Sequence, residues 1–347
     1  MTAPVTLSLD AMSGDHGHGV VVDAALSALR KHSELNLILV GDEPTLKQAL
    51  ATRKTRPSAR LALQHASEVV EMAESPSKAL RGKRDSSMRV AINLVKEGRA
   101  QATVSAGNTG ALMAMSRFVL KMLPGIDRPA IISAIPSLFG HTHVLDLGAN
   151  AECNAEQLFQ FAVMGSVVAS AVLGVNRPKV GLLNIGEEEI KGNEVIKEAA
   201  ALVQASTLNY IGFVEGDDVF LTDVDVVVCD GFTGNVALKT SEGVAKLIIQ
   251  FMKDEFNANW FHRAAAVAAF PALSNLKKRM DPRRYNGASF VGLNGTVVKS
   301  HGSADALAFA NAIGVALREV EQAVPARIAE LITALLPPLP HIEAQSA

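Results

Sequence analysis

Residues 225–239 read DVVVCDGFTGNVALK, and this stretch indicates the fold class. The apolar run 226–229 is too short for a helix and is typical of a buried parallel strand. The glycines that follow allow a tight turn, and Thr233 or Asn235 can cap a helix that starts near Val236. A strand end that opens onto a helix N-terminus presents N–H groups and a positive dipole end, which favour an anion such as phosphate. The same turn can also be purely structural, so this stretch alone leaves both interpretations open.

Composition and charge limit the class of protein. The chain has 347 residues, enough for one large α/β unit or two medium domains, and its net charge is −2. That charge gives no support to nucleic-acid binding, which needs a basic excess. Cys153 and Cys229 lack the spacing of a metal site and indicate unpaired thiols in a reducing compartment. Residues 1–10 show no signal-peptide pattern, and an apolar helix near 161–175 is shorter than the roughly 18–20 residues that span a bilayer, so we expect a cytoplasmic protein.

The strand and turn of the opening stretch recur along the chain. Short apolar strands alternate with helical patterns, which indicates a parallel sheet covered by helices. At least five strands end in a turn where glycine stands beside Asn, Asp, Thr or Lys. These turns lie at residues 10–17, 105–111, 146–151, 184–193 and 230–235, and residues 300–303 form another turn with glycine after a strand. Because carboxyl ends of parallel strands meet at one edge of a sheet, we expect these turns to face one ligand cleft.

The pattern changes at about 244–284, where apolar, aromatic and basic residues recur at helical spacing. Two interpretations stay open: a helical hairpin at an anionic membrane surface, or a helix buried in a dimer interface. On the first, the candidate membrane contacts are Phe256, Trp260, Phe261 and Phe270. We treat residues 1–336 as a single catalytic α/β unit that includes this segment, and we expect the proline-containing residues 337–347 to be a disordered tail.

Several familiar chemistries lack their motifs. The nine histidines, including the pair His141 and His143, show no carboxylates at ligand spacing, which argues against a metal site. The chain has no G-x-S-x-G elbow, no Walker sequence and no G-x-G-x-x-G spacing in its glycine-rich segment 14–19. What remains is a cleft of Asn, Thr, Gly and a few cations, which suits inorganic phosphate beside an acyl carbonyl. Phosphate is itself a competent nucleophile, so positioning and oxyanion stabilisation supply most of what such a transfer needs.

Seven stretches, taken together, resemble the phosphate acyltransferase family of bacterial phospholipid synthesis. They span nearly the whole chain in order: DAMSGDHG at 10–17, DSSM at 85–88, SAGNTGA at 105–111, DLGANAECNAEQLFQFAVMG at 146–165, NIGEEEIKGNE at 184–194, DGFTGNVALKTSEG at 230–243 and YNGASFVGLNGTVVKSHGSAD at 285–305. Ser13 and Asn286 stand where the family usually has glycine. Both residues tolerate the turn geometry, so these departures affect turn details rather than the expected activity.

The resemblance implies a three-layer α/β/α fold with a mostly parallel sheet, similar to isopropylmalate dehydrogenase, with a helical amphipathic insertion. It implies a homodimer, no metal and peripheral association with the inner face of the cell membrane, and we expect no cofactor. The implied reaction transfers a long-chain acyl group from acyl-acyl-carrier protein to phosphate by direct attack. The acyl-phosphate then serves glycerol-3-phosphate acylation by a downstream acyltransferase.

Within this interpretation, Lys191 and Asn235 are the candidate catalytic residues. Lys191 neutralises charge, and Asn235 joins Asn108, Asn150 and Thr233 around the phosphate and the thioester oxygen. The remaining candidate phosphate- and substrate-binding residues are His16, Thr109, Asn193, Asp230 and His301. Asp230 either orients a donor or caps the turn, and His301 either binds substrate or caps the following helix.

Three alternative functions stay open. They are a phosphotransacetylase that uses acyl-CoA, a decarboxylating NAD-dependent dehydrogenase of the same expected fold, and a non-enzymatic membrane scaffold. Carrier protein is generally acidic, so the basic segments 78–89 and 277–284 are alternative docking patches, and a solvated loop is the alternative interpretation of the first. Cys229 is an improbable nucleophile because it ends an apolar strand.

Overall fold

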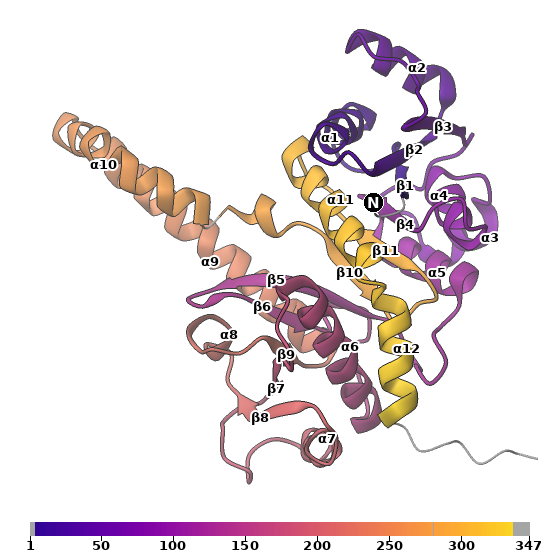
Figure 1. Cartoon of the computed structure of the whole chain (residues 1–347). Coiled ribbons are helices and arrows are strands. Elements are labelled where there is room, and N and C mark those ends of the chain that lie inside the picture. The colour runs from indigo at the N-terminus through magenta and orange to yellow at the C-terminus, as the bar shows by residue number, and fades with distance from the viewer. Residues whose placement is uncertain (1–3, 280, 336–347) are drawn as a thin grey trace, which may run out of the picture.

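A computed structural model describes residues 4–279 and 281–335, and eleven strands within them form one sheet. Across the sheet (Figure 1) the order is β3 (Leu61–His65), β2 (Leu35–Gly41), β1 (Val5–Asp10), β4 (Ala102–Ser105), β11 (Thr296–Lys299), β10 (Ala288–Val291), β5 (Ala130–Ser137), β6 (Gly140–Leu145), β9 (Val226–Val228), β7 (Lys179–Leu183) and β8 (Asn209–Val214). The predicted tail at 337–347 lies outside the described residues.

Helices cover both faces of this sheet. The helices are α1 (His18–Lys31), α2 (Glu43–Thr52), α3 (Pro76–Gly82), α4 (Ser87–Lys96), α5 (Thr109–Leu120), α6 (Ala155–Leu173), α7 (Glu194–Gln204), α8 (Asp218–Leu221), α9 (Gly231–Asn257), α10 (Trp260–Arg279), α11 (Ala306–Glu321) and α12 (Val324–Leu335), with a 3-10 turn at Pro282–Tyr285. Apolar side chains of α1 and α11 pack on one face of the first half of the sheet, and those of α6 and α12 pack on the second half. Side chains of α4 and α5 form a separate core with other strand residues. The predicted three-layer α/β/α architecture is confirmed.

The sheet is mostly parallel, but its two halves run in opposite directions. Strands β1 to β4 and β11 pair in parallel, and so do β6, β9, β7 and β8. Between them, β10 is antiparallel to both β11 and β5, and β5 is antiparallel to β6. The expectation that all glycine turns lie along one edge is therefore wrong. They form two groups, one at the carboxyl ends of each parallel half.

The stretch 225–239 forms a strand and a helix, with one boundary different from the prediction. β9 is fully buried and pairs in parallel with β6 and β7, as predicted for its apolar run. The helix begins at Gly231 rather than near Val236, because Asp230 is the cap: its Oδ1 accepts from the Thr233 N–H at 2.8 Å. Because this carboxylate cap follows directly after β9, Gly231 and Gly234 lie within the first turn of α9.

Helix α6 is the one described helix long and apolar enough to cross a membrane, with 19 residues. Its start at Ala155 is fixed by a reciprocal capping box between Asn154 and Gln157. The fold buries 72% of its apolar window, so α6 is a core helix here.

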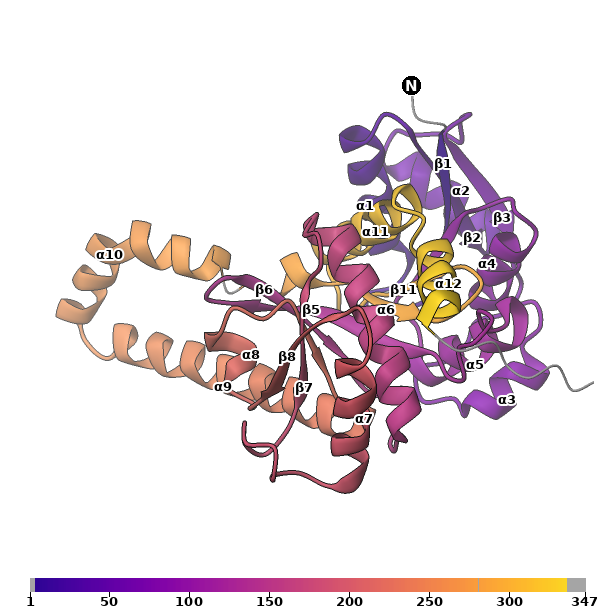
Figure 2. The same cartoon turned by 60° about the horizontal axis from the view of Figure 1, so that its bottom comes forward.

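Helices α9 and α10 form a hairpin that extends away from the body of the molecule (Figures 1 and 2). Its apolar side chains are largely exposed, among them Phe251 at 60%, Trp260 at 69%, Phe261 at 64% and Phe270 at 68%. Phe256 is partly buried, and the rings of Trp260 and Phe261 stack with centroids 3.6 Å apart. The hairpin therefore presents an apolar surface that the described chain itself does not cover.

Candidate functional site

The first turn group follows three neighbouring parallel strands, β1, β4 and β11. Each strand ends in a polar residue, namely Asp10, Ser105 and Lys299, and the register places Lys299 opposite Ser105. The Ser105 Oγ donates to Asp10 Oδ2 at 2.6 Å. Burial raises the pKa of Asp10, and hydrogen bonds from serine hydroxyls, first of all Ser105, oppose that shift. The strand ends thus form a layer of buried polar side chains, called the polar floor below, directly beneath the turns.

Hydrogen bonds join the turns above this floor. The Ser13 Oγ accepts from the Ala106 N–H at 3.1 Å, and the Ser105 Oγ accepts from the Gly107 N–H at 3.1 Å. The Asp15 N–H donates to the Gly302 carbonyl at 2.8 Å. Each of the three turns is consequently bonded to another, so their backbone groups are held in one arrangement.

Lys299 lies beneath this arrangement with only 9% of its surface exposed. Its Nζ donates to the Ala106 carbonyl at 3.3 Å and to the Ser300 carbonyl. Burial lowers the pKa of Lys299 to about 8, although the charges of Asp10 and Asp15 favour the protonated form. An ammonium group therefore ties the turn after β4 to the turn after β11.

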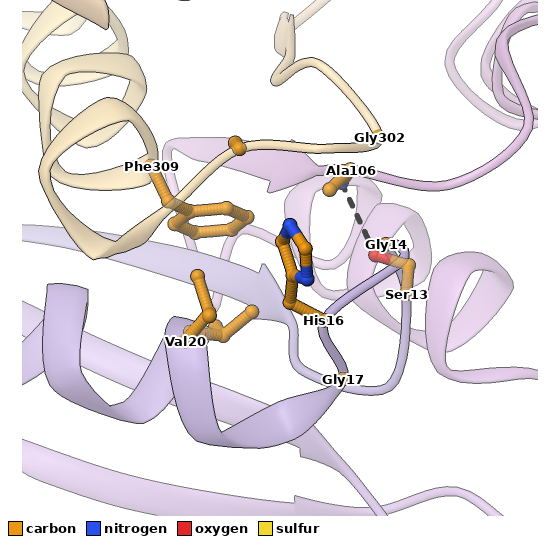
Figure 3. Close-up of a pocket in the computed structure, with 10 residues that line it drawn as sticks. Ser13, Gly14, His16, Gly17, Val20, Ala106, Gly302 and Phe309 are labelled. Atoms are coloured by element: carbon orange, nitrogen blue, oxygen red, sulfur yellow. Dashed lines mark hydrogen bonds between the residues drawn. The ribbon is translucent and has the colours of Figure 1, made fainter.

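A small pocket opens between these turns and the start of α1 (Figure 3). Its volume of about 10 Å³ suits one water-sized group. The exposed His16 points its ring between Gly302 and Phe309. Helix α1 starts at this pocket with Gly17 as its N-cap, without a side-chain cap and without an acidic residue in its first turn. Its first N–H groups and positive dipole end therefore favour an anion.

Asn108 and Thr109 lie at the start of α5 in the same group. The Asn108 Oδ1 caps the helix by accepting from the Ala111 N–H at 2.9 Å. Its Nδ2 donates to the Met72 carbonyl at 2.8 Å and to the Glu74 carbonyl at 3.0 Å, which uses both amide hydrogens. Asn108 therefore fixes the turn, while the exposed Thr109 faces outward beside it.

His301 lies in the turn after β11, within electrostatic range of α9. Its Nδ1 lies 2.8 Å from the Ser303 Oγ, and its N–H donates to Asn286 Oδ1 at 2.9 Å. Burial lowers the pKa of His301, and the positive charges of Lys299 and Lys239 lower it further. Because Lys239 belongs to α9, this helix starts in the second turn group and passes within electrostatic range of the first.

The second turn group is built around Asp146, which is fully buried. Its Oδ1 accepts from the backbone N–H groups of Ile131 at 2.9 Å and Ala149 at 3.1 Å, and its Oδ2 accepts from that of Asn150 at 2.7 Å. The Asn150 Nδ2 also donates to Asp146 Oδ2 and to the Pro129 carbonyl. Burial raises the pKa of Asp146, and these donors oppose the shift. Asn150 is thus buried and holds its own turn in place through these hydrogen bonds.

The first turn of α9 packs directly on Asp146 and Asn150. A Cβ at Gly234 would lie 2.0 Å from the Asp146 carbonyl oxygen, so no side chain fits there. Both the N–H and the Oγ of Thr233 donate to the Asp230 carboxylate, which makes Asp230 a helix cap in this structure. Asn235 is exposed, with its Cβ 3.5 Å from the position of a Cβ at Gly148 in the turn after β6. Within the described part of the chain, its amide makes no hydrogen bond.

Lys191 and Asn193 lie in the turn after β7. The Asn184 Nδ2 closes this turn by donating to the carbonyls of Gly186 at 3.1 Å and Lys191 at 3.3 Å. Asn193 caps α7 by accepting from the Ile196 N–H at 2.9 Å. The Lys191 side chain is exposed and forms no ion pair with any residue in 4–279 or 281–335.

The structure therefore divides the sequence candidates into two sets. His16, Asn108, Thr109 and His301 belong to the first turn group, and Asn150, Lys191, Asn193, Asp230, Thr233 and Asn235 belong to the second. Sequence reasoning missed the buried residues that hold the turns, namely Asp10, Ser105, Asp146 and Lys299. Their signal is a polar residue directly at the carboxyl end of an apolar strand.

The cysteines show no sign of nucleophilic activation. Burial raises the pKa of the Cys229 thiol, and burial raises that of Cys153 to about 12. Among the described residues, no three His, Cys, Asp or Glu side chains come together as a metal site. His143 is buried, and burial lowers its pKa to about 3.

Comparison with known proteins identifies the family. The sequence model of a family described as "Fatty acid synthesis protein" matches residues 5–327. A protein named phosphate acyltransferase from Methylococcus capsulatus is 61% identical over 94% of this chain and 97% of its own length. The protein of that name from Halorhodospira halophila is 59% identical over 97% of this chain and 98% of its own length.

Solved structures show the same fold in more distant proteins. A phosphotransacetylase from Streptococcus pyogenes has a TM-score of 0.62 at 16% identity, covering 92% of this chain and 94% of its own. A 4-hydroxythreonine-4-phosphate dehydrogenase from Klebsiella pneumoniae has a TM-score of 0.52 at 13% identity, covering 92% of this chain and 100% of its own. The fold is thus one that phosphotransacetylases and dehydrogenases share, and, on the sequence similarity over nearly its full length, the chain belongs to the phosphate acyltransferase family of fatty acid synthesis proteins.

Proposed function

We propose that this enzyme transfers a long-chain acyl group from acyl-acyl-carrier protein to inorganic phosphate. The observation that carries the proposal is the first turn group, where Asp10, Ser105 and Lys299 hold three strand-end turns around the uncapped N-terminus of α1. Such an arrangement offers preorganised N–H groups to an anion. Family membership supplies the acyl-transfer chemistry, and the carrier-protein thioester is our inference.

The proposed reaction needs no covalent enzyme intermediate. A phosphate oxygen attacks the thioester carbon and forms a C–O bond, giving a tetrahedral intermediate with a negative oxygen. The C–S bond then breaks, and the sulfur leaves as a thiolate that takes the proton lost by the attacking phosphate. Positioning the phosphate anion against the thioester carbon and stabilising the oxyanion are the main demands on the protein.

The two turn groups divide these demands. In the proposal, His16, Thr109 and His301 contact phosphate or substrate from the first group, and Asn193 contributes from the second. Asp230 and Thr233 hold the start of α9, because both donors of Thr233 already bond to the Asp230 carboxylate. Lys191 and Asn235 are the proposed catalytic residues, since their polar ends are exposed and make no ion pair or hydrogen bond within the described chain. Asn108 and Asn150 act by holding backbone N–H groups in place, because their own amide hydrogens are already used.

The α9–α10 hairpin supports a second part of the proposal. Its exposed apolar side chains suit both a homodimer contact along α9 and a peripheral contact with an anionic membrane near α10. We place the enzyme in the cytoplasm at the inner face of the cell membrane. There, its product passes to a glycerol-3-phosphate acyltransferase before this reactive mixed anhydride hydrolyses.

A comparison of acyl donors tests the proposed substrate. The enzyme is incubated with phosphate and either palmitoyl-acyl-carrier protein or palmitoyl-CoA, and acyl-phosphate is trapped with hydroxylamine. We expect a much higher kcat/KM with the carrier protein. A clear preference for the CoA thioester would assign the chain to the phosphotransacetylase type instead, and no acyl-phosphate from either donor would reject the function.

A further inference from the structure

Positive charge is strongly concentrated in one part of this acidic chain. Residues 75–121 contain nine Lys and Arg against two Asp and Glu, whereas the whole chain has 33 against 35. Seven of the nine lie on α3, on the loop that follows it, on the start of α4 and at the end of α5. We call these seven residues and Phe118 the basic face; its cations are Lys78, Arg81, Lys83, Arg84, Arg89, Arg117 and Lys121.

The elements that carry the basic face form one continuous unit. Helix α5 packs against both α3 and α4. A Cβ at Gly110 on α5 would lie 2.8 Å from the Pro76 ring at the start of α3, so the two helices are in close contact. In Figures 1 and 2 these helices lie on the other side of the molecule from α10. The basic face is thus a single surface, well separated from the apolar hairpin.

An exposed aromatic ring lies within the basic face. Phe118 is 53% exposed, and the Arg89 guanidinium and the Lys121 ammonium lie 5.0 Å and 4.9 Å from its ring centroid. Two cations therefore flank an apolar anchor, the pattern of a protein-binding surface rather than of a solvated loop. None of the seven cations forms an ion pair within 4–279 and 281–335, so their charges are available to a partner.

In the other basic segment, at 277–284, one cation is already engaged within the chain. Arg283 already pairs with Asp281 at 2.6 Å and with Asp305 at 2.9 Å. Its positive charge is therefore largely compensated inside the chain. The face on α3 to α5 combines seven cations that form no ion pair within the described residues with an exposed aromatic ring.

The basic face is also connected to the site. The Asn108 amide bonds the chain at Met72 and Glu74, just before α3, to the turn after β4. Phe118 lies ten residues along α5 from Asn108, about 15 Å at 1.5 Å per residue. A partner bound to this face would thus lie about 15 Å from the turn after β4, a distance that a flexible thioester arm can span.

We propose that the basic face docks the acidic carrier protein that delivers the acyl thioester. This proposal rests on the proposed function for the identity of the partner. Acidic side chains of the carrier pair with the cations of α3 and α4, and an apolar side chain of the carrier contacts Phe118. The hairpin stays open to its own partner while the carrier is bound.

Direct binding of carrier protein that bears no acyl group tests the proposal. Titrations at low and high salt compare wild type with Arg84→Glu, Phe118→Ala and the control Arg56→Glu, an exposed charge reversal in the loop after α2. We expect salt-sensitive binding by wild type and Arg56→Glu, with a Kd raised roughly tenfold or more in Arg84→Glu and Phe118→Ala. Equal affinity in all four proteins, or no binding by wild type, would overturn the dock.

Turnover of a small acyl thioester, which needs no docking surface, tests the proposed acyl transfer independently of the proposed carrier-protein dock. Arg84→Glu should cleave palmitoyl-pantetheine in the presence of phosphate at the wild-type rate, since its dock alone is altered. A matching loss with the small thioester would show a folding or active-site defect and contradict the docking role of Arg84. If wild type binds the carrier but cleaves no thioester with phosphate, the proposed function fails while the dock stands.

Discussion

The Nζ of Lys299 donates to the carbonyl oxygen of Ala106 at 3.3 Å, which joins the end of β11 to the turn after β4. The same ammonium also donates to the Ser300 carbonyl. Lys299 is nearly enclosed, with Asp10 and Asp15 as its nearby negative charges and His301 as a titratable neighbour on its own turn. The geometry of the first turn group therefore depends on one buried proton-carrying group.

Replacing Lys299 should slow the reaction at phosphate. Lys299→Met leaves the Ala106 and Ser300 carbonyls without their donor, which costs about 1–3 kcal/mol and loosens the turns. We expect kcat/KM for phosphate to fall roughly tenfold or more, because 1.4 kcal/mol is a factor of ten. Steady-state kinetics with phosphate varied measure this, and an unchanged kcat/KM in a folded variant would remove Lys299 from the account.

Activity and stability should respond to alkaline pH in opposite directions. The pKa of Lys299 is lowered to about 8 in the folded chain from its ordinary 10.5, so between these values the unfolded chain binds more protons. The free energy of unfolding should then rise with pH across this window, by at most about 3 kcal/mol. Over the same window the turns lose a charged donor, and acyl transfer should decline. In Lys299→Met, neither the rise in the free energy of unfolding nor the decline in acyl transfer should occur in this pH range. If the variant still shows both pH effects, they belong to another titrating group.

Gly234 should be irreplaceable although it lies in a helix. An alanine Cβ would meet the Asp146 carbonyl oxygen at 2.0 Å, so Gly234→Ala must displace α9 from the second turn group. We expect a loss of about 1–3 kcal/mol in urea unfolding together with a fall in turnover. Gly243→Ala, in the same helix with nothing within 4 Å, is the matched control and should gain up to about 1 kcal/mol. Equal effects of the two substitutions would contradict this packing.

Glu319 should make the fold less stable as pH rises from 4.5 to about 7. It is buried beside Ser289, which donates to its Oε1, and burial raises its pKa to about 7 from 4.5. Its stabilising contribution is complete below pH 4.5 and is lost as pH rises to about 7, by at most about 3 kcal/mol. Glu319→Gln should flatten this part of the pH profile in urea unfolding, whereas the exposed Glu321→Gln on the same helix should keep it. A profile unchanged by Glu319→Gln would show that this carboxyl does not titrate as described.

Charge on the tip of the hairpin should abolish membrane binding. Trp260 and Phe261 are 69% and 64% exposed, so Trp260→Glu and Phe261→Glu leave the core untouched but place charge in an apolar surface. We expect both variants to remain unbound in flotation with anionic vesicles. Ile211→Glu, at an exposed position on the edge strand β8, should float like wild type. Flotation of all three variants would exclude this segment as the membrane contact.

Much of the architecture could be predicted from local pattern alone. The apolar run before Asp230 predicts a buried parallel strand because only such a strand is short and apolar on both faces, and β9 is one. The direction of the second half could not be predicted, because pairing between β11, β10 and β5 joins segments far apart in the chain. The sequence predicted the turns but not the roles of Asn108 and Asn150, since the backbone carbonyls that their amides bind lie 34 or more and 21 residues away. Lys299 ends the apolar strand 296–299, but a lysine at a strand end is usually solvent-exposed, so this position alone does not predict its burial.

Direct attack of phosphate on the thioester is tested most directly by a single-turnover experiment that starts without phosphate. The enzyme in excess is mixed with palmitoyl-acyl-carrier protein, and release of the carrier thiol is followed before and after phosphate is added. We predict no thiol release until phosphate is present, then one acyl-phosphate formed for each thiol released. A burst of thiol in the absence of phosphate, with the acyl group recovered on the protein, would contradict the account.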